Sequence, residues 1–163
     1  MAVEELQRQR VARLLGREPR GLEAIAVVDE QGEPRVIRVA SLVNDKPFPT
    51  LFWLVDAALN YRIDQEEARG LIGDLQARVN HDPELQAAMR ADHEAHIRLR
   101  DSYIDASLRT RLAQLGYLEV FAQRGIGGIG DFRHIRCLHT WYAAHLVVSN
   151  TVGRLLDQYW TAG

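Results

Sequence analysis

The chain has 163 residues, of which 47% are hydrophobic and 26% are charged, as is usual for a soluble globular protein. Its 20 basic and 22 acidic residues give a formal charge of −2. This balance argues against nonspecific binding to nucleic acid or to anionic membranes, because both need a basic surface. A single cysteine, Cys137, excludes an internal disulfide. No apolar run approaches the ~18 residues of a membrane span, and the N-terminus lacks a signal-peptide pattern. We therefore expect a cytoplasmic protein with one domain, residues 1–163.

The first third of the chain predicts one helix followed by a small antiparallel sheet. Residues 3–15 carry a rough apolar stripe and end at Gly16, which suits a helix C-terminus. Two β-branched runs, residues 24–28 and 35–39, flank a loop that contains glycine and predict a hairpin. The apolar run at residues 51–55 follows two prolines and predicts a third strand. Three strands covered on one face by helices are enough for a stable sheet.

Capping signals then predict where the next two helices begin. Asp64 and Glu67 have the spacing of a capping box, with Asp in the usual position of Ser or Thr, so a helix is expected to start at Asp64. Asp82 followed by Pro83 combines a good N-cap with a proline in the first helical position, and predicts a second start.

The C-terminal part predicts an interior helix. Residues 131–149 are apolar on nearly all sides, which is typical of a buried helix, and a short helix is expected at 152–160. The expected fold class is therefore α+β, with about three antiparallel strands within residues 24–55 packed against a helical bundle from residues 56–163.

The segment Gly125–Gly153 is mostly apolar but contains several polar or reactive residues. It holds a Gly-rich loop, the only cysteine and three of the six histidines. Residues 125–130 match G-x-G-x-x-G, but too few residues follow to complete a parallel βαβ unit, so a dinucleotide-binding fold is rejected. Gly127 and Gly128 could still bring backbone N–H groups to an anion at a helix N-terminus. Alternatively, Asp131 caps a flexible turn and occupies these N–H groups itself.

Two polar residues, His93 and Arg100, interrupt the apolar face of the helix that begins near Pro83. They are seven residues apart and therefore lie one above the other. A buried arginine must find a carboxylate, a phosphate or backbone carbonyls. An internal salt bridge is the structural interpretation, and a bound ligand is the functional one. We expect this face to pack toward Gly127–His139, where the two polar regions satisfy each other.

Cys137, His139 and His145 have the spacing Cys-x-His-x5-His, and by residue type they suit zinc. On one regular helix, however, Cys137 and His139 lie roughly 160° apart. Both could hold one ion only if Cys137 lies in a non-helical turn before the helix. The sequence therefore predicts no metal and no cofactor, with His139 and His145 as hydrogen-bonded core histidines.

Cys137 is also a candidate nucleophile. It would lie in the first turns of the last long helix, next to Arg136. A helix N-terminus and neighbouring cations lower the pKa of a thiol, as an attacking thiolate requires. The alternative is an inert, buried cysteine that acts as a small hydrophobic residue.

Several short motifs, in the same order, resemble a known family. They are LGREPRG at 15–21, PFPTL at 47–51, DPEL at 82–85, His93-Glu94 with Arg100-Asp101, GGIGDFRHIRCLH at 127–139, His145, and Asn150-x-x-Gly153. Together they are similar to the bacterial domain-of-unknown-function family 501. This family usually has Arg-Cys-Pro near the first hairpin, where this chain has Val28-Asp29-Glu30, so the resemblance does not supply a two-cysteine metal site. The resemblance identifies residues that match the family motifs, but it implies no reaction, because the family has no established activity.

Three hypotheses for function remain open. The first is a binding or regulatory protein that holds a small anionic ligand, such as one bearing phosphate, between the helix 83–104 and the segment 125–139. Its expected ligand-binding residues are His93, Arg100, Gly127, Gly128, Asp131, Arg136, His145 and Asn150. The second is an enzyme of hydrolase or group-transfer type that uses Cys137 or His139 at the same place. The third is a purely structural role, with contacts between copies in a homo-oligomer. A Cys–His hydrogen bond that faces solvent would favour the enzyme.

Overall fold

A computed structural model describes residues 3–162 and confirms the α+β fold class. The helices are α1 (Glu5–Leu15), α2 (Ala57–Ala68), α3 (Leu71–Asn80), α4 (Pro83–Ser102), α5 (Ala106–Leu115), α6 (Leu118–Gln123), α7 (Leu138–Val147) and α8 (Thr151–Ala162), with a 3₁₀ turn, η1 (Ile126–Gly128), before α7. The strands are β1 (Leu22–Val28), β2 (Pro34–Val39), β3 (Leu42–Val43), β4 (Lys46–Pro47) and β5 (Phe52–Leu54). None of the helices within residues 3–162 has the length and apolar character needed to cross a membrane.

The main sheet has three antiparallel strands in the order β1-β2-β5, as the sequence predicts. Ile37 in the central strand pairs with Ile25 on one side and with Trp53 on the other. The hairpin between β1 and β2 is closed by the carboxylate of Asp29, which accepts the N–H groups of Gln31 and Glu33. A separate two-stranded hairpin, β3–β4, leads into β5. Strand β5 is thus an outer strand of the main sheet.

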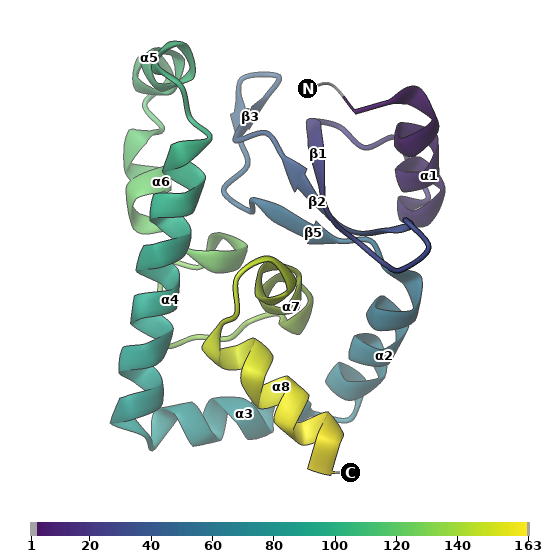
Figure 1. The fold of residues 1–163 in the computed structure, drawn as a ribbon. Coiled ribbons are helices and arrows are strands. Elements are labelled where there is room, and N and C mark those ends of the chain that lie inside the picture. Colours follow the sequence, from purple (N-terminus) through teal and green to yellow (C-terminus); the bar gives the residue numbers. More distant parts are fainter. Residues whose placement is uncertain (1–2, 163) are drawn as a thin grey trace.

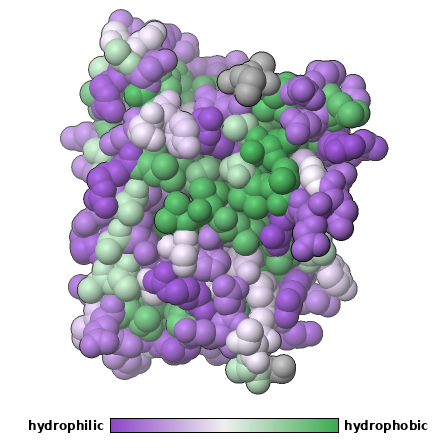
Figure 2. All heavy atoms as spheres, viewed as in Figure 1, coloured by the Kyte–Doolittle hydropathy of each residue, from purple (hydrophilic) through white to green (hydrophobic). Residues whose placement is uncertain are grey.

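Helices α1 and α7 lie on different sides of this sheet (Figure 1). Ile37 and Trp53 belong to a cluster with Val11 of α1, whereas Val36 and Phe52 belong to the larger core around α7. The split follows from strand geometry, because successive side chains point to opposite faces. On the face drawn in Figure 2, hydrophobic residues gather over the middle, where Figure 1 places the sheet, and hydrophilic residues surround them.

Helix α7 is the interior helix of the fold, as expected from its apolar sequence. Trp141 and Ala143 have no exposed surface. The long helix α4 runs beside it, and α3 and α8 lie toward one end of the molecule (Figure 1). Helix α4 begins as predicted, with Pro83 in the first turn and the Asp82 carboxylate accepting the N–H groups of Glu84 and Leu85.

Two expected helix starts are wrong, and both errors affect the site. Helix α2 begins at Ala57, because the N-cap is Asp56, whose carboxylate accepts the Leu59 N–H; Asp64 therefore lies inside this helix rather than at its start. Helix α7 begins at Leu138 rather than after Asp131. The segment between Asp131 and Leu138 is not helical.

Candidate functional site

Cys137 and His139 lie side by side at the N-terminus of α7. The Cys137 Sγ is 3.6 Å from the His139 Nδ1. The expectation that these residues sit on opposite faces of one helix is wrong, because Cys137 is the N-cap and has an extended backbone with φ −145° and ψ 124°. The non-helical position that the metal hypothesis required is thus the observed one.

The turn before Cys137 sets this geometry. Arg136 has a φ of 67°, a left-handed conformation that is uncommon for a residue with a side chain. The Cys137 N–H donates to the Ile135 carbonyl at 2.8 Å, which closes a three-residue turn. Backbone strain of this kind is concentrated at functional sites in proteins. The Arg136 side chain itself is exposed.

Helix α2 contributes two carboxylates to the same place. The Asp64 Oδ1 lies 2.8 Å from the His139 Nε2, and the Glu67 Oε2 lies 3.5 Å from the His139 Nδ1. Glu67 also accepts the Leu138 N–H at 2.9 Å and so caps α7. Asp64 and Glu67 are three residues apart, which places them on one side of α2. The result is a continuous series, Asp64–His139–Cys137, with Glu67 beside it.

These contacts favour an ion pair between thiolate and imidazolium. The hydrogen bond with Cys137 is the main cause that raises the pKa of His139 to about 9, and Glu67 and Asp64 add to it against the opposing effect of burial. Burial acts to raise the pKa of the Cys137 thiol, but the hydrogen bond with His139 and the backbone N–H of Thr140 outweigh it, so the net shift is downward. Cys137 is half-buried, so part of the residue is open to solvent.

An open cavity of about 400 Å³ lies next to this series. It is lined by β5, by Thr50 and Asn60, and by His139 and Thr140 of the first turn of α7. A substrate in this cavity would contact the imidazole that is paired with the thiol.

A second cavity of similar volume lies between α1 and the sheet, and neither Cys137 nor His139 is part of its lining. Its charged residues are Arg17, Glu18 and Arg20, and the rest of its lining is mostly apolar. It contains no thiol, histidine or carboxylate pair arranged for chemistry, so we place the candidate site at Cys137.

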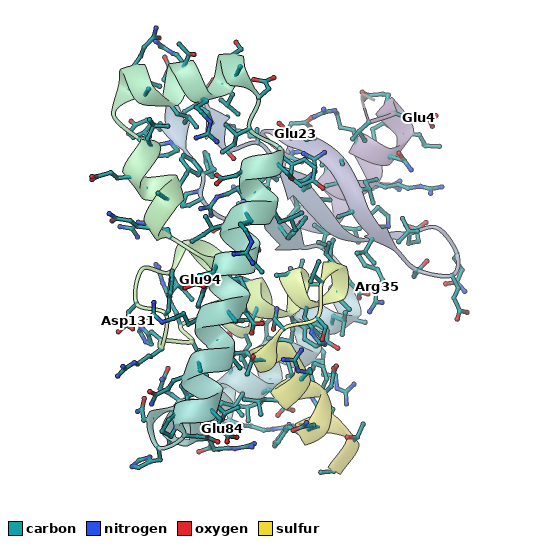
Figure 3. All side chains as sticks on the ribbon, turned by 60° about the vertical axis from the view of Figure 1, so that its left-hand side comes forward. Glu4, Glu23, Arg35, Glu84, Glu94 and Asp131 are labelled. Carbon is teal, nitrogen blue, oxygen red and sulfur yellow. The ribbon has the colours of Figure 1, made fainter. Side chains whose placement is uncertain are left out.

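The polar residues of α4 meet the Gly-rich segment, but they bind backbone groups there. Arg100 has no exposed surface and donates to the carbonyls of Pro49, Phe121 and Arg124 at 2.8, 2.5 and 2.7 Å. His93 accepts the Ile126 N–H on its Nδ1 at 3.0 Å. The guanidinium partners are therefore carbonyls rather than the carboxylates considered from the sequence. Figure 3 shows Asp131 and Glu94 on the outside of the fold, and both are exposed.

The glycines of the loop allow close packing. Gly127 and Gly128 have φ values of 66° and 71°, and a Cβ on Gly127 would lie 2.6 Å from the Thr140 Oγ1. The N–H groups of Ile126 and Gly128 are bonded within the fold, to the His93 ring and the Gly125 carbonyl. The loop is thus shaped by its contacts with α4 and α7.

His145 and Asn150 form a separate polar connection between α7 and α8. The His145 Nε2 lies 2.8 Å from the Asp157 Oδ2, and the His145 Nδ1 accepts the Asn150 N–H. The Asn150 side chain donates to the Trp141 carbonyl and accepts the Gly153 N–H. These residues orient the two helices and do not join the Cys137 series.

Three residues of the site also have the chemistry of metal ligands. The ligand atoms of Glu67, Cys137 and His139 all lie within 4.8 Å of one another, and oxygen, sulfur and imidazole nitrogen together suit zinc. Asp64 binds the other ring nitrogen of His139, which is how a carboxylate commonly orients a metal-binding histidine. Because Cys137 is the N-cap and not part of the helix, helix geometry does not keep it apart from His139.

Sequence reasoning found Cys137 and His139 but missed Asp64 and Glu67 as members of the site. The sequence shows these two acidic residues three positions apart, but this spacing was interpreted as a helix cap. Their partner His139 is 75 residues beyond Asp64, so no local pattern could connect them.

Comparison with known proteins gives a family without an activity. No curated protein and no solved structure matched the chain. A family model described as a protein of unknown function, DUF501, matches residues 25–158. The matched range covers β2, β5 and the second half of β1, together with the Asp64–His139–Cys137 series and the Gly-rich loop. The chain therefore belongs to the DUF501 family.

Proposed function

We propose that the protein is an enzyme that uses Cys137 as a nucleophile in hydrolysis or group transfer at a carbonyl carbon. The observation that carries this proposal is the contact between the Cys137 Sγ and the His139 Nδ1 at 3.6 Å, with Asp64 on the opposite ring nitrogen. A nucleophile, a base and a group that orients the base have the same roles in other covalent catalysts.

Each residue has a role in a balanced reaction. The Cys137 thiolate attacks the carbonyl carbon and forms a C–S bond, while the electron pair of the C=O bond moves to oxygen. The N-terminus of α7 stabilises that negative charge. When the C=O bond re-forms, the bond to the leaving group breaks, and the leaving group takes a proton from the His139 imidazolium. Water, deprotonated by His139, then attacks the thioester and releases the acid and the thiol.

An anion pocket on α4 has weaker support. Three backbone carbonyls already bind the Arg100 guanidinium, and His93 already accepts the Ile126 N–H. A ligand that bound the same guanidinium nitrogens would have to displace these bonds, at the cost of leaving buried carbonyls without donors.

The single thiol gives a direct test of the proposal. We expect iodoacetamide to alkylate Cys137 at pH 6 faster than it alkylates free cysteine, because the hydrogen bond with His139 lowers the pKa of the thiol. In His139→Ala the thiol returns toward an ordinary pKa of about 8.5, and the rate at pH 6 should fall toward that of free cysteine. His134→Ala removes an exposed histidine from the same segment and should leave the rate unchanged.

Turnover is tested with p-nitrophenyl acetate. We expect a rapid release of one p-nitrophenolate per chain and an acetyl group on Cys137, both detected by absorbance and mass spectrometry, and neither in Cys137→Ser. A thiol that reacts at pH 6 as slowly as free cysteine, and that is never acetylated, would show that Cys137 is not a nucleophile.

A zinc centre is the second candidate, favoured by the three ligand atoms within 4.8 Å of one another. Three protein ligands leave one position for water or substrate, as in catalytic zinc sites. Elemental analysis of protein purified without chelators decides between the two. Zinc near one per chain, lost in both Cys137→Ala and His139→Ala, together with a thiol that reacts only after chelation, would support the metal. Metal-free protein with a reactive thiol would support the nucleophile.

A further inference from the structure

Within residues 3–162, no strand pairs with the outer edge of β5, and this edge borders the cavity next to His139. On its inner edge, β5 and its flanking residues bond to β2: the Leu51 carbonyl accepts the Val39 N–H, and the Val55 N–H donates to the Arg35 carbonyl. Backbone groups of an antiparallel strand alternate between its two edges. The N–H and C=O groups of Phe52 and Leu54 therefore face away from β2.

These outward groups are almost all without partners. Asn60 donates from its side chain to the Leu54 carbonyl at 3.0 Å, which occupies one acceptor. In the part of the chain that the structure describes, residues 3–162, no hydrogen bond reaches the Phe52 N–H, the Phe52 carbonyl or the Leu54 N–H. Two donors and one acceptor thus remain on one edge of a three-residue strand.

The cavity of about 400 Å³ runs along this edge. It touches Phe52, Trp53 and Leu54 in succession, although the Trp53 side chain packs with the α1 cluster and the other two pack in the α7 core. A cavity that touches three consecutive strand residues contacts the backbone edge, because their side chains alternate. The same cavity reaches His139, whose Nδ1 is 3.6 Å from the Cys137 Sγ.

We infer that the substrate is an extended peptide that adds to β5 as a further strand and presents a backbone amide carbonyl to Cys137. Its backbone supplies carbonyls for the N–H groups of Phe52 and Leu54 and an N–H for the Phe52 carbonyl. Pairing of this kind is a general mode of peptide recognition. Asn60 blocks the next acceptor and limits the pairing to this short edge. Docking stands on the strand edge alone, whereas cleavage rests on the thiol function proposed above.

Cleavage of such a peptide follows the reaction already described. The C–N bond of the amide breaks, the amine of the C-terminal fragment takes the proton from the His139 imidazolium, and the N-terminal fragment remains on Cys137 as a thioester. Water hydrolyses this thioester to a carboxylic acid, so no further reactant is needed.

The docking step is tested with Cys137→Ala and a pool of short, unstructured peptides of random sequence. We expect bound peptide to slow amide hydrogen exchange at Phe52 and Leu54, measured by NMR. The Trp53 amide is an internal control, because it already faces β2 and should be slow with or without peptide. If peptides bind but slow exchange elsewhere and leave these two amides unchanged, the inference is overturned.

The cleavage step is tested with wild-type protein and the same pool, read by mass spectrometry. A cleaved peptide is resynthesised with an N-methyl group on each backbone amide in turn. Methyl groups on the alternate amides that face β5 should slow cleavage at least about tenfold, as expected for one lost hydrogen bond and the added clash. Methyl groups on the amides between them should have little effect. Equal effects at all positions would overturn docking on β5.

The two proposals fail in different ways. A thiol that is acetylated by p-nitrophenyl acetate, combined with peptides that neither protect Phe52 and Leu54 nor are cleaved, would remove the peptide inference and leave the nucleophile. Protection of these amides with an unreactive thiol would keep the docking surface and remove the catalytic role of Cys137.

Discussion

At the scale of single residues, the surroundings of a polar side chain separate a structural role from a reactive one. Arg100 is fully buried, and three carbonyls bind its guanidinium. His139 is partly exposed, with a carboxylate on one ring nitrogen and a thiol beside the other. A buried polar side chain that is hydrogen-bonded to the backbone stabilises a fold, whereas a strongly shifted pKa next to a cavity is typical of a functional site.

Arg100→Leu tests the structural role of Arg100. It removes the donors for the three buried carbonyls, and we expect it to lower the free energy of unfolding by about 3–5 kcal/mol, measured by urea denaturation. Arg98→Leu changes an exposed residue of the same helix and should stay within about 0.5 kcal/mol of wild type. Both results should be independent of added phosphate. A loss that appears only with phosphate would instead indicate the anion site considered from the sequence.

At the scale of elements, short irregular segments place the long helices. The turn at Arg136 and the N-cap at Cys137 delay the start of α7 until Leu138. The turn η1 packs against α4 through the bond from the Ile126 N–H to His93. Close packing at η1 depends on Gly125, where a Cβ would lie 2.1 Å from the His93 Nδ1.

Gly125→Ala should therefore be much more harmful than the same change in an open helix. The added methyl group must displace the fully buried His93 ring, and we expect a loss of about 2–3 kcal/mol. Gly73→Ala is the matched control, because Gly73 lies inside α3 with no atom within 4 Å of its Cβ position. It should stabilise the protein by about 0.5–1 kcal/mol. Equal thermal unfolding of the two variants would contradict this account of the η1 packing.

At the scale of the whole molecule, two buried histidines make stability depend on pH. Burial, with a contribution from Arg90, lowers the pKa of His93 to about 4. Burial, with contributions from Arg100 and His93, lowers the pKa of His96 to about 3. Both rings would have a pKa near 6.5 in the unfolded chain, which therefore binds more protons than the folded state below that pH.

We expect stability to be fully present above pH 6.5 and to fall as the pH drops toward 4. Each histidine contributes up to about 1.4 kcal/mol per pH unit in this window. The pKa shifts of His139 and Cys137 have opposite directions, so their contributions to the pH dependence of stability oppose each other between pH 6.5 and about 8. Urea denaturation at pH values from 4 to about 8 measures the free energy of unfolding below and above pH 6.5. A slope below pH 6.5 that does not decrease in His96→Leu would contradict the assignment.

Local sequence signals determined most of the elements of this fold. Gly16 ends α1 in a left-handed conformation, and Asp82 with Pro83 starts α4. The hairpin, the third strand and the buried character of α7 also follow from patterns of a few residues. Such signals act through backbone conformation, capping and alternation, which depend only on near neighbours. The sequence also identified Cys137 and His139 as the candidate reactive pair.

Only the tertiary structure decided which other residues lie beside Cys137 and His139. Asp64 and Glu67 reach His139 because α2 packs beside the N-terminus of α7, and no local pattern encodes a contact across more than 70 residues. Arg136 adopts a positive φ although arginine has no preference for it, so the start of α7 could not be predicted. The free edge of β5 likewise depends on which strand pairs with which, and that is set by the packing of the whole chain.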